Sequence, residues 1–132
     1  MPELPEVETI VRELKQTLEG KRISHVDVLW ERSFTDASTE FKKKVVGQSL
    51  DSIYRRGKYI CFQCSGDVFF TVHLRMTGKL VFDPTEKEQN HIRVKFVIGE
   101  DRLYFVDVRK FGKITLYETP DVLDEKLGVE PL

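Results

Sequence analysis

The sequence lacks any long hydrophobic run. No segment approaches the ~18 uninterrupted apolar residues that a membrane-spanning helix needs, although 40% of its 132 residues are hydrophobic. Its glutamate-rich beginning also lacks the basic segment and apolar stretch of a secretory signal peptide. These absences argue against membrane and secreted proteins, so we expect a cytoplasmic protein. The length fits one ordinary domain.

Cysteine is scarce. Cys61 and Cys64 form a C-x-x-C pattern, which by itself suggests a redox pair or half of a zinc site. Both fall in a predicted strand, where three residues at ~3.3 Å each place the Cα atoms ~10 Å apart, too far for a disulfide. No second Cys or Cys/His pair could complete four zinc ligands. We therefore expect reduced structural thiols, and no metal or cofactor in this chain.

A net excess of positive charge is also missing. The formal net charge is -1, which argues mildly against nucleic-acid binding. The distribution is uneven, however. Acidic residues collect in residues 3–13 and 121–125, whereas basic residues collect in residues 42–44, 55–58 and 109–113. The sequence therefore leaves room for a locally basic face.

Three segments have the apolar spacing of helices. The longest runs from Pro5 to Leu18, with Pro5 suited to a first turn and Gly20 to a helix end. Shorter helices are predicted over residues 38–46 and 121–127, the second closed by Gly128. Residues 83–90, which include Pro84 and four charged side chains, predict a flexible surface loop.

Alternating apolar and polar residues predict strands in the rest of the chain. The apolar members of these patterns are, in order, Val26, Val28 and Trp30; Ile60, Phe62 and Cys64; Val68, Phe70, Val72 and Leu74; Ile92, Val94, Phe96 and Ile98; Leu103 and Phe105; Ile114 and Leu116. The prediction is a mainly β fold in one domain, residues 1–132. It is an antiparallel two-layer β-sandwich flanked by an N-terminal amphipathic helix and short helices.

A proline in second position has a specific chemical use. Removal of Met1 would expose a secondary amine, which can attack an electrophilic carbon and form an iminium, as lysine does in Schiff bases. An α-amino group titrates near ~7.7–8.0 instead of the ~10.4 of lysine, so a useful fraction is unprotonated at neutral pH. The alternative is structural: Pro2 and Pro5 introduce a helix whose dipole Glu3 and Glu6 complement.

Four motifs in order resemble the formamidopyrimidine-DNA glycosylase family. The opening PELPEVET (residues 2–9) resembles the family's beginning, and RRGKY (55–59) resembles its strand-turn lysine. HLRMTG (73–78) and DVRKFG (107–112) resemble its intercalation loop and second wedge. Beyond these four motifs, the final LGVEPL (127–132) also resembles the end of the family's N-terminal domain. Each motif alone is weak. Together they are specific, and the resemblance spans essentially the whole chain.

The resemblance implies a base-excision repair enzyme, a DNA glycosylase and AP lyase that removes oxidised purines such as 8-oxoguanine and formamidopyrimidines. Pro2 would be the nucleophile that attacks C1′ of the damaged nucleotide, and Glu3 would donate a proton. Glu6 would support the amine, and Lys58 would contact phosphate or act as an auxiliary acid. Leu4 and the Arg109-Lys110-Phe111 run resemble the oxidised-purine branch more than the oxidised-pyrimidine branch.

The resemblance also implies a set of DNA contacts. Met76 and Phe111 would be apolar wedges that fill the gap left by a flipped nucleotide, and Arg109 would meet the acceptor edge of an orphaned cytosine. His73, Arg75 and His91 would hold phosphates. The alternative places Met76 and Phe111 in the core and Arg109 on a solvated surface. His25 matches nothing in the family and is expected to be structural or exposed.

The family normally continues into a helical DNA-binding domain and a four-cysteine zinc finger, and we expect neither in this chain. An isolated domain, or one that keeps Met1, is expected to cut poorly. The expected partner is damaged double-stranded DNA. We expect a monomer that associates with the nucleoid when it binds DNA and that does not bind a membrane.

Two alternatives stay open. One is a noncatalytic DNA- or protein-binding β-sandwich that keeps only the family's shape. The other is an N-terminal-proline tautomerase, which the helix predicted directly after the proline disfavours.

Overall fold

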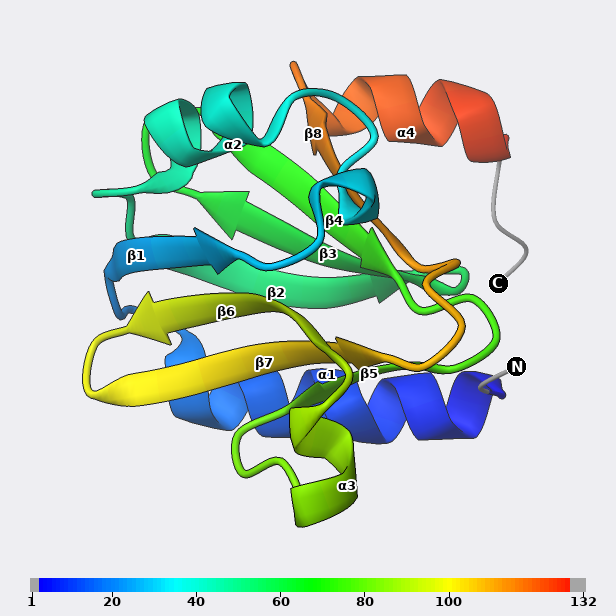
Figure 1. Cartoon of the computed structure of the whole chain (residues 1–132). Helices are drawn as coiled ribbons and strands as arrows, with labels where there is room; N and C mark the ends of the chain where they lie inside the picture. The colour runs from blue at the N-terminus through cyan, green and yellow to red at the C-terminus, as the bar shows by residue number, and fades with distance from the viewer. Residues whose placement is uncertain (1–2, 129–132) are drawn as a thin grey trace.

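A computed structural model describes residues 3–128, and these form two stacked antiparallel sheets with helices around them (Figure 1). One sheet has the strand order β1-β6-β7-β5 and the other β2-β3-β4-β8. The strands are β1 (Ile23–Val28), β2 (Leu50–Arg56), β3 (Tyr59–Cys64), β4 (Phe69–His73), β5 (Gly78–Val81), β6 (Ile92–Ile98), β7 (Asp101–Asp107) and β8 (Lys113–Tyr117). The helices are α1 (Leu4–Leu18), α2 (Ser38–Val45), α3 (Glu86–Gln89), α4 (Pro120–Leu127) and the 3-10 helix η1 (Glu31–Ser33). The predicted β-sandwich is confirmed.

The core lies between the two sheets because each strand turns alternate side chains inward. Phe70 of β4 stacks on Phe62 of β3 at 4.7 Å between ring centroids, and it reaches Phe96 of the other sheet at 6.2 Å. Phe41 of α2 meets Phe70 edge-on at 5.0 Å. The rings therefore link both sheets and one helix into a single cluster.

Helix α1 packs its apolar face into this same core. Four side chains at helical spacing are buried: Val7, Val11, Leu14 and Leu18. At its C-terminal end the helix is tied to β2, since Lys15 Nζ donates to the Ile53 carbonyl (3.0 Å) and the Ile53 amide donates to Glu19 (2.8 Å). This packing confirms the predicted amphipathic helix, and it fixes where Glu3 and Glu6 lie.

The two cysteines lie on opposite faces of β3. Cys64 faces the main core, whereas Cys61 joins Phe69 and Leu123 in a small second cluster under α4. Both thiols are buried and neither belongs to a disulfide, and burial raises the pKa of Cys64 to about 12, with Asp51 adding to the shift. The prediction of reduced structural thiols is confirmed.

The structure corrects three details of the sequence prediction. Residues 83–90 hold helix α3, which begins with reciprocal hydrogen bonds between Thr85 and Glu88 at 3.2 and 2.9 Å; this capping box starts a helix where the sequence composition predicts a loop. Strands β2 and β5 had not been predicted. Trp30 lies beyond the end of β1, whose inward residues Ile23 and Val26 are three apart because a bulge interrupts the pairing.

Candidate functional site

Most of the candidate residues come from one end of the sandwich. Figure 1 shows the start of α1, the β2–β3 turn, the β4–β5 connection and the β7–β8 connection on the same side of the molecule. We call residues 74–77 the Met76 loop and residues 108–112 the Phe111 loop. The two loops touch, because Thr77 Oγ1 accepts a hydrogen bond from the Arg109 amide (2.9 Å).

The start of α1 presents two exposed carboxylates. Glu3 is the N-cap residue, and its carbonyl accepts hydrogen bonds from the Glu6 and Val7 amides at 3.0 and 3.1 Å. Glu6 stands in the first turn, where the positive end of the helix dipole favours a negative side chain. The predicted nucleophile Pro2 lies outside the described residues.

Lys58 occupies the two-residue turn between β2 and β3. Gly57 has a φ of 61°, a left-handed conformation that suits glycine. Arg55 holds this turn, since its guanidinium donates to the Gly57 carbonyl (2.8 Å) and pairs with Glu8 of α1. The turn that carries Lys58 is thereby tied to the helix that carries Glu3 and Glu6.

His73 ends β4, and its hydrogen bond indicates which ring nitrogen carries the proton. The Arg75 amide donates to His73 Nδ1 (3.1 Å), which leaves the ring proton of the neutral imidazole on Nε2. Burial, followed by the positive charges of Arg75, Lys126 and Lys58, lowers the pKa of His73 to about 4. At neutral pH His73 is therefore an uncharged donor, which can hold a phosphate oxygen without itself titrating.

The Met76 loop exposes its apolar tip. Met76 is 48% exposed, and Arg75 beside it has a left-handed φ of 57°. At the base of the loop a Cβ on Gly78 would lie 2.5 Å from the Leu74 carbonyl oxygen, so only glycine fits there. A strained residue and a close backbone approach thus hold a hydrophobic side chain out in solvent.

The Phe111 loop has the same character. Phe111 is 49% exposed, with the Arg109 guanidinium 5.3 Å from its ring centroid. Lys110 has a left-handed φ of 62° and places its ammonium 4.1 Å from the centroid of Trp30. The alternative that Met76 and Phe111 are core residues is wrong, because both side chains are accessible from solvent.

His91 lies just before β6, beside the base of the Phe111 loop. Its carbonyl accepts the Asp107 amide (2.9 Å), and its Nδ1 lies 3.5 Å from the Arg93 guanidinium. Arg93 also donates to the Asp107 carbonyl (2.9 Å). His91 and Arg93 therefore lie next to the Phe111 loop. His25, by contrast, is exposed on β1 and contacts Ser24.

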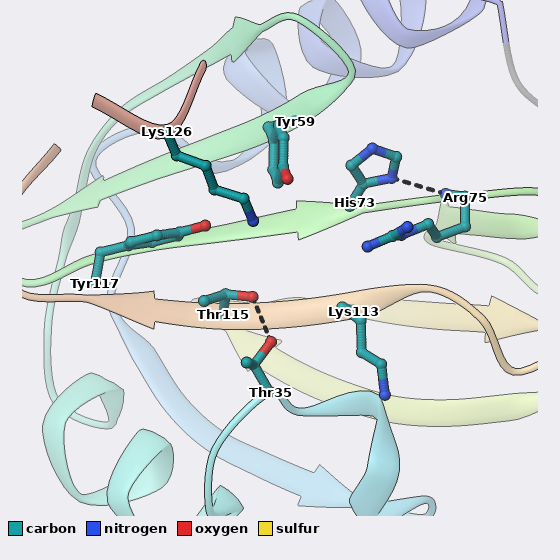
Figure 2. A pocket seen from close by; sticks show the side chains of 8 residues that line it. All are labelled: Thr35, Tyr59, His73, Arg75, Lys113, Thr115, Tyr117 and Lys126. Carbon is teal, nitrogen blue, oxygen red and sulfur yellow. Dashed lines mark hydrogen bonds between the residues drawn. The ribbon is translucent and has the colours of Figure 1, made fainter. Parts of the chain in front are cut away.

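A basic cavity of about 410 Å³ adjoins His73 on the outer face of the second sheet (Figure 2). Figure 2 shows Arg75 and Lys126 pointing toward one another across it, with the Thr35–Thr115 hydroxyl pair below (2.6 Å). Its lining residues are Thr35, Tyr59, His73, Arg75, Lys113, Thr115, Tyr117 and Lys126, with no carboxylate among them. An anionic group is the ligand that this set of charges suits.

Sequence reasoning missed Lys113 and Lys126 as members of this surface. Lys113, Thr115 and Tyr117 form the polar face of β8 and line the cavity together, so the alternation of that strand offered a signal. Lys126 had no such signal, because only the docking of α4 brings it beside Tyr59, whose ring centroid is 5.7 Å from the ammonium.

Within residues 3–128 no group of three or more His, Cys, Asp or Glu side chains could hold a metal ion. None of the helices in that range is both long and apolar enough to cross a membrane.

The fold and this site define a class: a β-sandwich domain that presents exposed apolar tips and cationic side chains at one end. Comparison with known proteins agrees, because the family model described as the formamidopyrimidine-DNA glycosylase N-terminal domain matches residues 1–114. The chain belongs to the formamidopyrimidine-DNA glycosylase family.

Similar proteins include formamidopyrimidine-DNA glycosylases from two bacteria. The one from Protochlamydia amoebophila is 43% identical over 136 residues, covering 100% of this chain and 49% of the relative. The one from Lactococcus lactis subsp. cremoris is 38% identical over 138 residues, covering 99% and 50%. The chain therefore spans about half the length of these curated relatives.

Solved structures show the same similarity. The crystal structure of the Lactococcus lactis enzyme bound non-covalently to DNA containing an AP site has a TM-score of 0.84 and 35% identity, over 96% of this chain and 49% of that one. A complex of a mutant of that enzyme with Fapy-dG-containing DNA also has a TM-score of 0.84, at 36% identity. The two-sheet architecture is thus that of a domain solved in complex with damaged DNA.

Proposed function

We propose that this chain is the N-terminal catalytic half of a DNA glycosylase and AP lyase that removes oxidised purines through its N-terminal proline. The observation that carries the proposal is the pair of half-exposed apolar side chains, Met76 and Phe111, on touching loops at the end of the molecule where α1 begins. A protein that does chemistry on a stacked base must extrude it and fill the gap. Apolar side chains that enter the base stack do this.

The proposed reaction starts at Pro2 after Met1 has been removed. Its nitrogen bonds to C1′ while the bond from C1′ to the base breaks, and the base leaves with that electron pair and takes a proton. Glu3, exposed at the start of α1, protonates the sugar oxygen as the ring opens to a Schiff base. Loss of a C2′ proton then expels the 3′ phosphate, and Glu6 supports the amine through these steps.

The remaining candidate residues would bind the DNA. Lys58, neutral His73 and Arg75 would hold phosphates of the damaged strand, and the basic cavity behind His73 would take a further phosphate. Arg109 would donate to the orphaned cytosine, with its guanidinium already placed over Phe111. His91 would contact phosphate beside the Phe111 loop.

The test is borohydride trapping of a covalent adduct on an 8-oxoguanine:cytosine duplex. Mass spectrometry of the N-terminus selects a sample that lacks Met1, and Pro2→Gly is the control that removes the secondary amine. We expect an adduct with the wild-type chain and none with Pro2→Gly. If a Met-free sample binds the duplex without forming an adduct, the chain is a noncatalytic DNA-binding module.

A further inference from the structure

Asp107 is a buried carboxylate that the proposed reaction does not use. It ends β7 at 0% exposure, and it is the only charged side chain classed as buried within residues 3–128. A buried carboxylate is costly unless hydrogen bonds satisfy it. Here both of its oxygens accept hydrogen bonds, and the two donors come from different segments of the chain.

The two donors belong to the two loops at the candidate site. Asp107 Oδ1 accepts from Thr77 Oγ1 at 2.6 Å, next to Met76. Asp107 Oδ2 accepts from the Gly112 amide at 2.8 Å, next to Phe111. Since Thr77 Oγ1 also accepts from the Arg109 amide (2.9 Å), its hydroxyl joins the loops a second time.

The packing around Gly112 leaves no space for a side chain at this position. A Cβ there would lie 2.5 Å from Phe105 Cζ and 2.9 Å from Asp107 Oδ2, and Phe105 is fully buried. Each loop also holds one strained residue, Arg75 with a φ of 57° and Lys110 with a φ of 62°. The hydrogen bonds to Asp107 supply the restraint that such conformations need.

We propose that Asp107 is a positioning residue that locks the Met76 and Phe111 loops into one preassembled wedge. Thr77 connects Asp107 to Arg109, because its hydroxyl donates to Asp107 and accepts from the Arg109 amide. This inference rests on the proposed function for its purpose, because two side chains that enter one gap in a base stack must keep a fixed spacing. Preorganisation lowers the ordering cost when DNA binds.

The first test needs no DNA. Thr77→Val keeps the side-chain shape and removes the hydroxyl, whereas Thr77→Ser keeps the hydroxyl and is the matched control. Amide hydrogen exchange by NMR is followed at Arg109 and Gly112, with ring motion at Phe111. We expect roughly tenfold faster exchange at Arg109 in Thr77→Val, the order of effect for one lost hydrogen bond, greater motion of Phe111, and near wild-type behaviour in Thr77→Ser.

Unchanged exchange at Arg109 and unchanged motion of Phe111 in Thr77→Val would overturn the coupling of the two loops. If valine prevents folding, Thr77→Ala removes the same hydroxyl without adding bulk. Asp107→Ala, which removes both acceptor oxygens, is expected to free both loops together. Release of only one loop in Asp107→Ala would also overturn the proposal.

The second test separates wedge positioning from the chemistry at Pro2. Borohydride trapping is compared on an 8-oxoguanine:cytosine duplex and on a single-stranded abasic oligonucleotide, which has no stack to enter. For Thr77→Val we expect roughly tenfold less adduct on the duplex, within the ~10²-fold that misplaced groups can cost, and no change on the single strand. Equal losses on both substrates would overturn the positioning role. If the wild-type chain traps neither, the proposed function fails, while the exchange experiment still decides the coupling.

Discussion

Met76 and Phe111 differ from the apolar residues that lie in the core beside their loops. Their neighbours Leu74 and Phe105 are 2% and 0% exposed, whereas these two side chains remain about half in solvent. An exposed apolar side chain contributes little to folding, so the strain at Arg75 and Lys110 is not offset by burial at the loop tips. At the scale of single residues, the two loops lower the free energy of unfolding, and in return the side chains of Met76 and Phe111 stay exposed to solvent.

Met76→Ala is therefore expected to separate stability from DNA distortion. The free energy of unfolding should change by no more than about 0.5 kcal/mol, as for other exposed positions. Adduct formation on a lesion duplex should fall about tenfold or more, because the base stack loses its wedge. Val46→Ala, at a 38% exposed residue directly after α2, is the control that should leave both quantities unchanged. Equal effects of the two substitutions would contradict the wedge role.

The lowered pKa of His73 predicts how its ring titrates and how the free energy of unfolding depends on pH. NMR titration of its ring should show a midpoint near pH 4 instead of 6.5. Between these values the unfolded chain binds a proton at His73 and the folded chain does not. The free energy of unfolding therefore falls as the pH is lowered through that window.

In His73→Gln this contribution should vanish, so the pH profile of unfolding should be flatter between pH 6.5 and about 4. Arg75→Gln should raise the midpoint only in part, because burial is the larger cause of the low pKa. A wild-type midpoint near 6.5 would show that the imidazole is solvated and titrates like an unburied histidine, which would contradict the prediction.

At the scale of elements, α4 acts as the cover of the second sheet's outer face. Leu123 is 1% exposed and packs with Cys61 and Phe69, while Arg56 of β2 pairs with Asp124 at 3.0 Å. The same helix brings Lys126 to the basic cavity. Docking of one short helix thus both closes a small apolar cluster and completes a cationic surface.

Leu123→Ala should loosen this helix. We expect a loss of about 2 kcal/mol or more in the free energy of unfolding, as for other buried leucines, and faster amide exchange throughout α4. Leu127→Ala, at a 36% exposed position of the same helix, should cost no more than about 0.5 kcal/mol. If Leu123→Ala is as mild as Leu127→Ala, α4 is not held by its apolar contact.

Several of the elements that sequence patterns identified have uninterrupted periods. Helix α1 and strands β3 and β4 keep their spacing to the end, so their buried faces could be predicted. Strand β2 could not, because a bulge between Leu50 and Ser52 puts the buried residues Leu50 and Ile53 three apart. Strand β5 has only four residues, too few for a period to show.

At the scale of the whole molecule, charge distribution matters more than net charge. The chain has 22 acidic and 21 basic residues, yet the cavity beside His73 gathers Arg75, Lys113 and Lys126 with no carboxylate in its lining. This arrangement makes the near-neutral composition compatible with the proposed DNA-binding role, since phosphates respond to the local field.

The salt dependence of DNA binding tests this local field. Each phosphate contact contributes about 0.9 to the slope of log affinity against log salt, so Lys126→Ala and Arg75→Gln should each reduce the slope by about 1. Lys44→Ala, in the last turn of α2, is the matched control and should leave the slope unchanged. If all three substitutions reduce the slope equally, binding depends on overall charge and not on the cavity.

The sequence by itself determined the periods of most elements, the β-sandwich class and the order of four family motifs, because these depend on neighbours along the chain. It also marked Met76, Arg109 and Phe111, but could not say whether their side chains were exposed. Only the tertiary structure decided that, together with the neutral state of His73, the joining of the two loops through Asp107 and the place of Lys126. Each of these depends on contacts between residues far apart in the sequence, such as Thr77 with Asp107 and Tyr59 with Lys126, which no local pattern encodes.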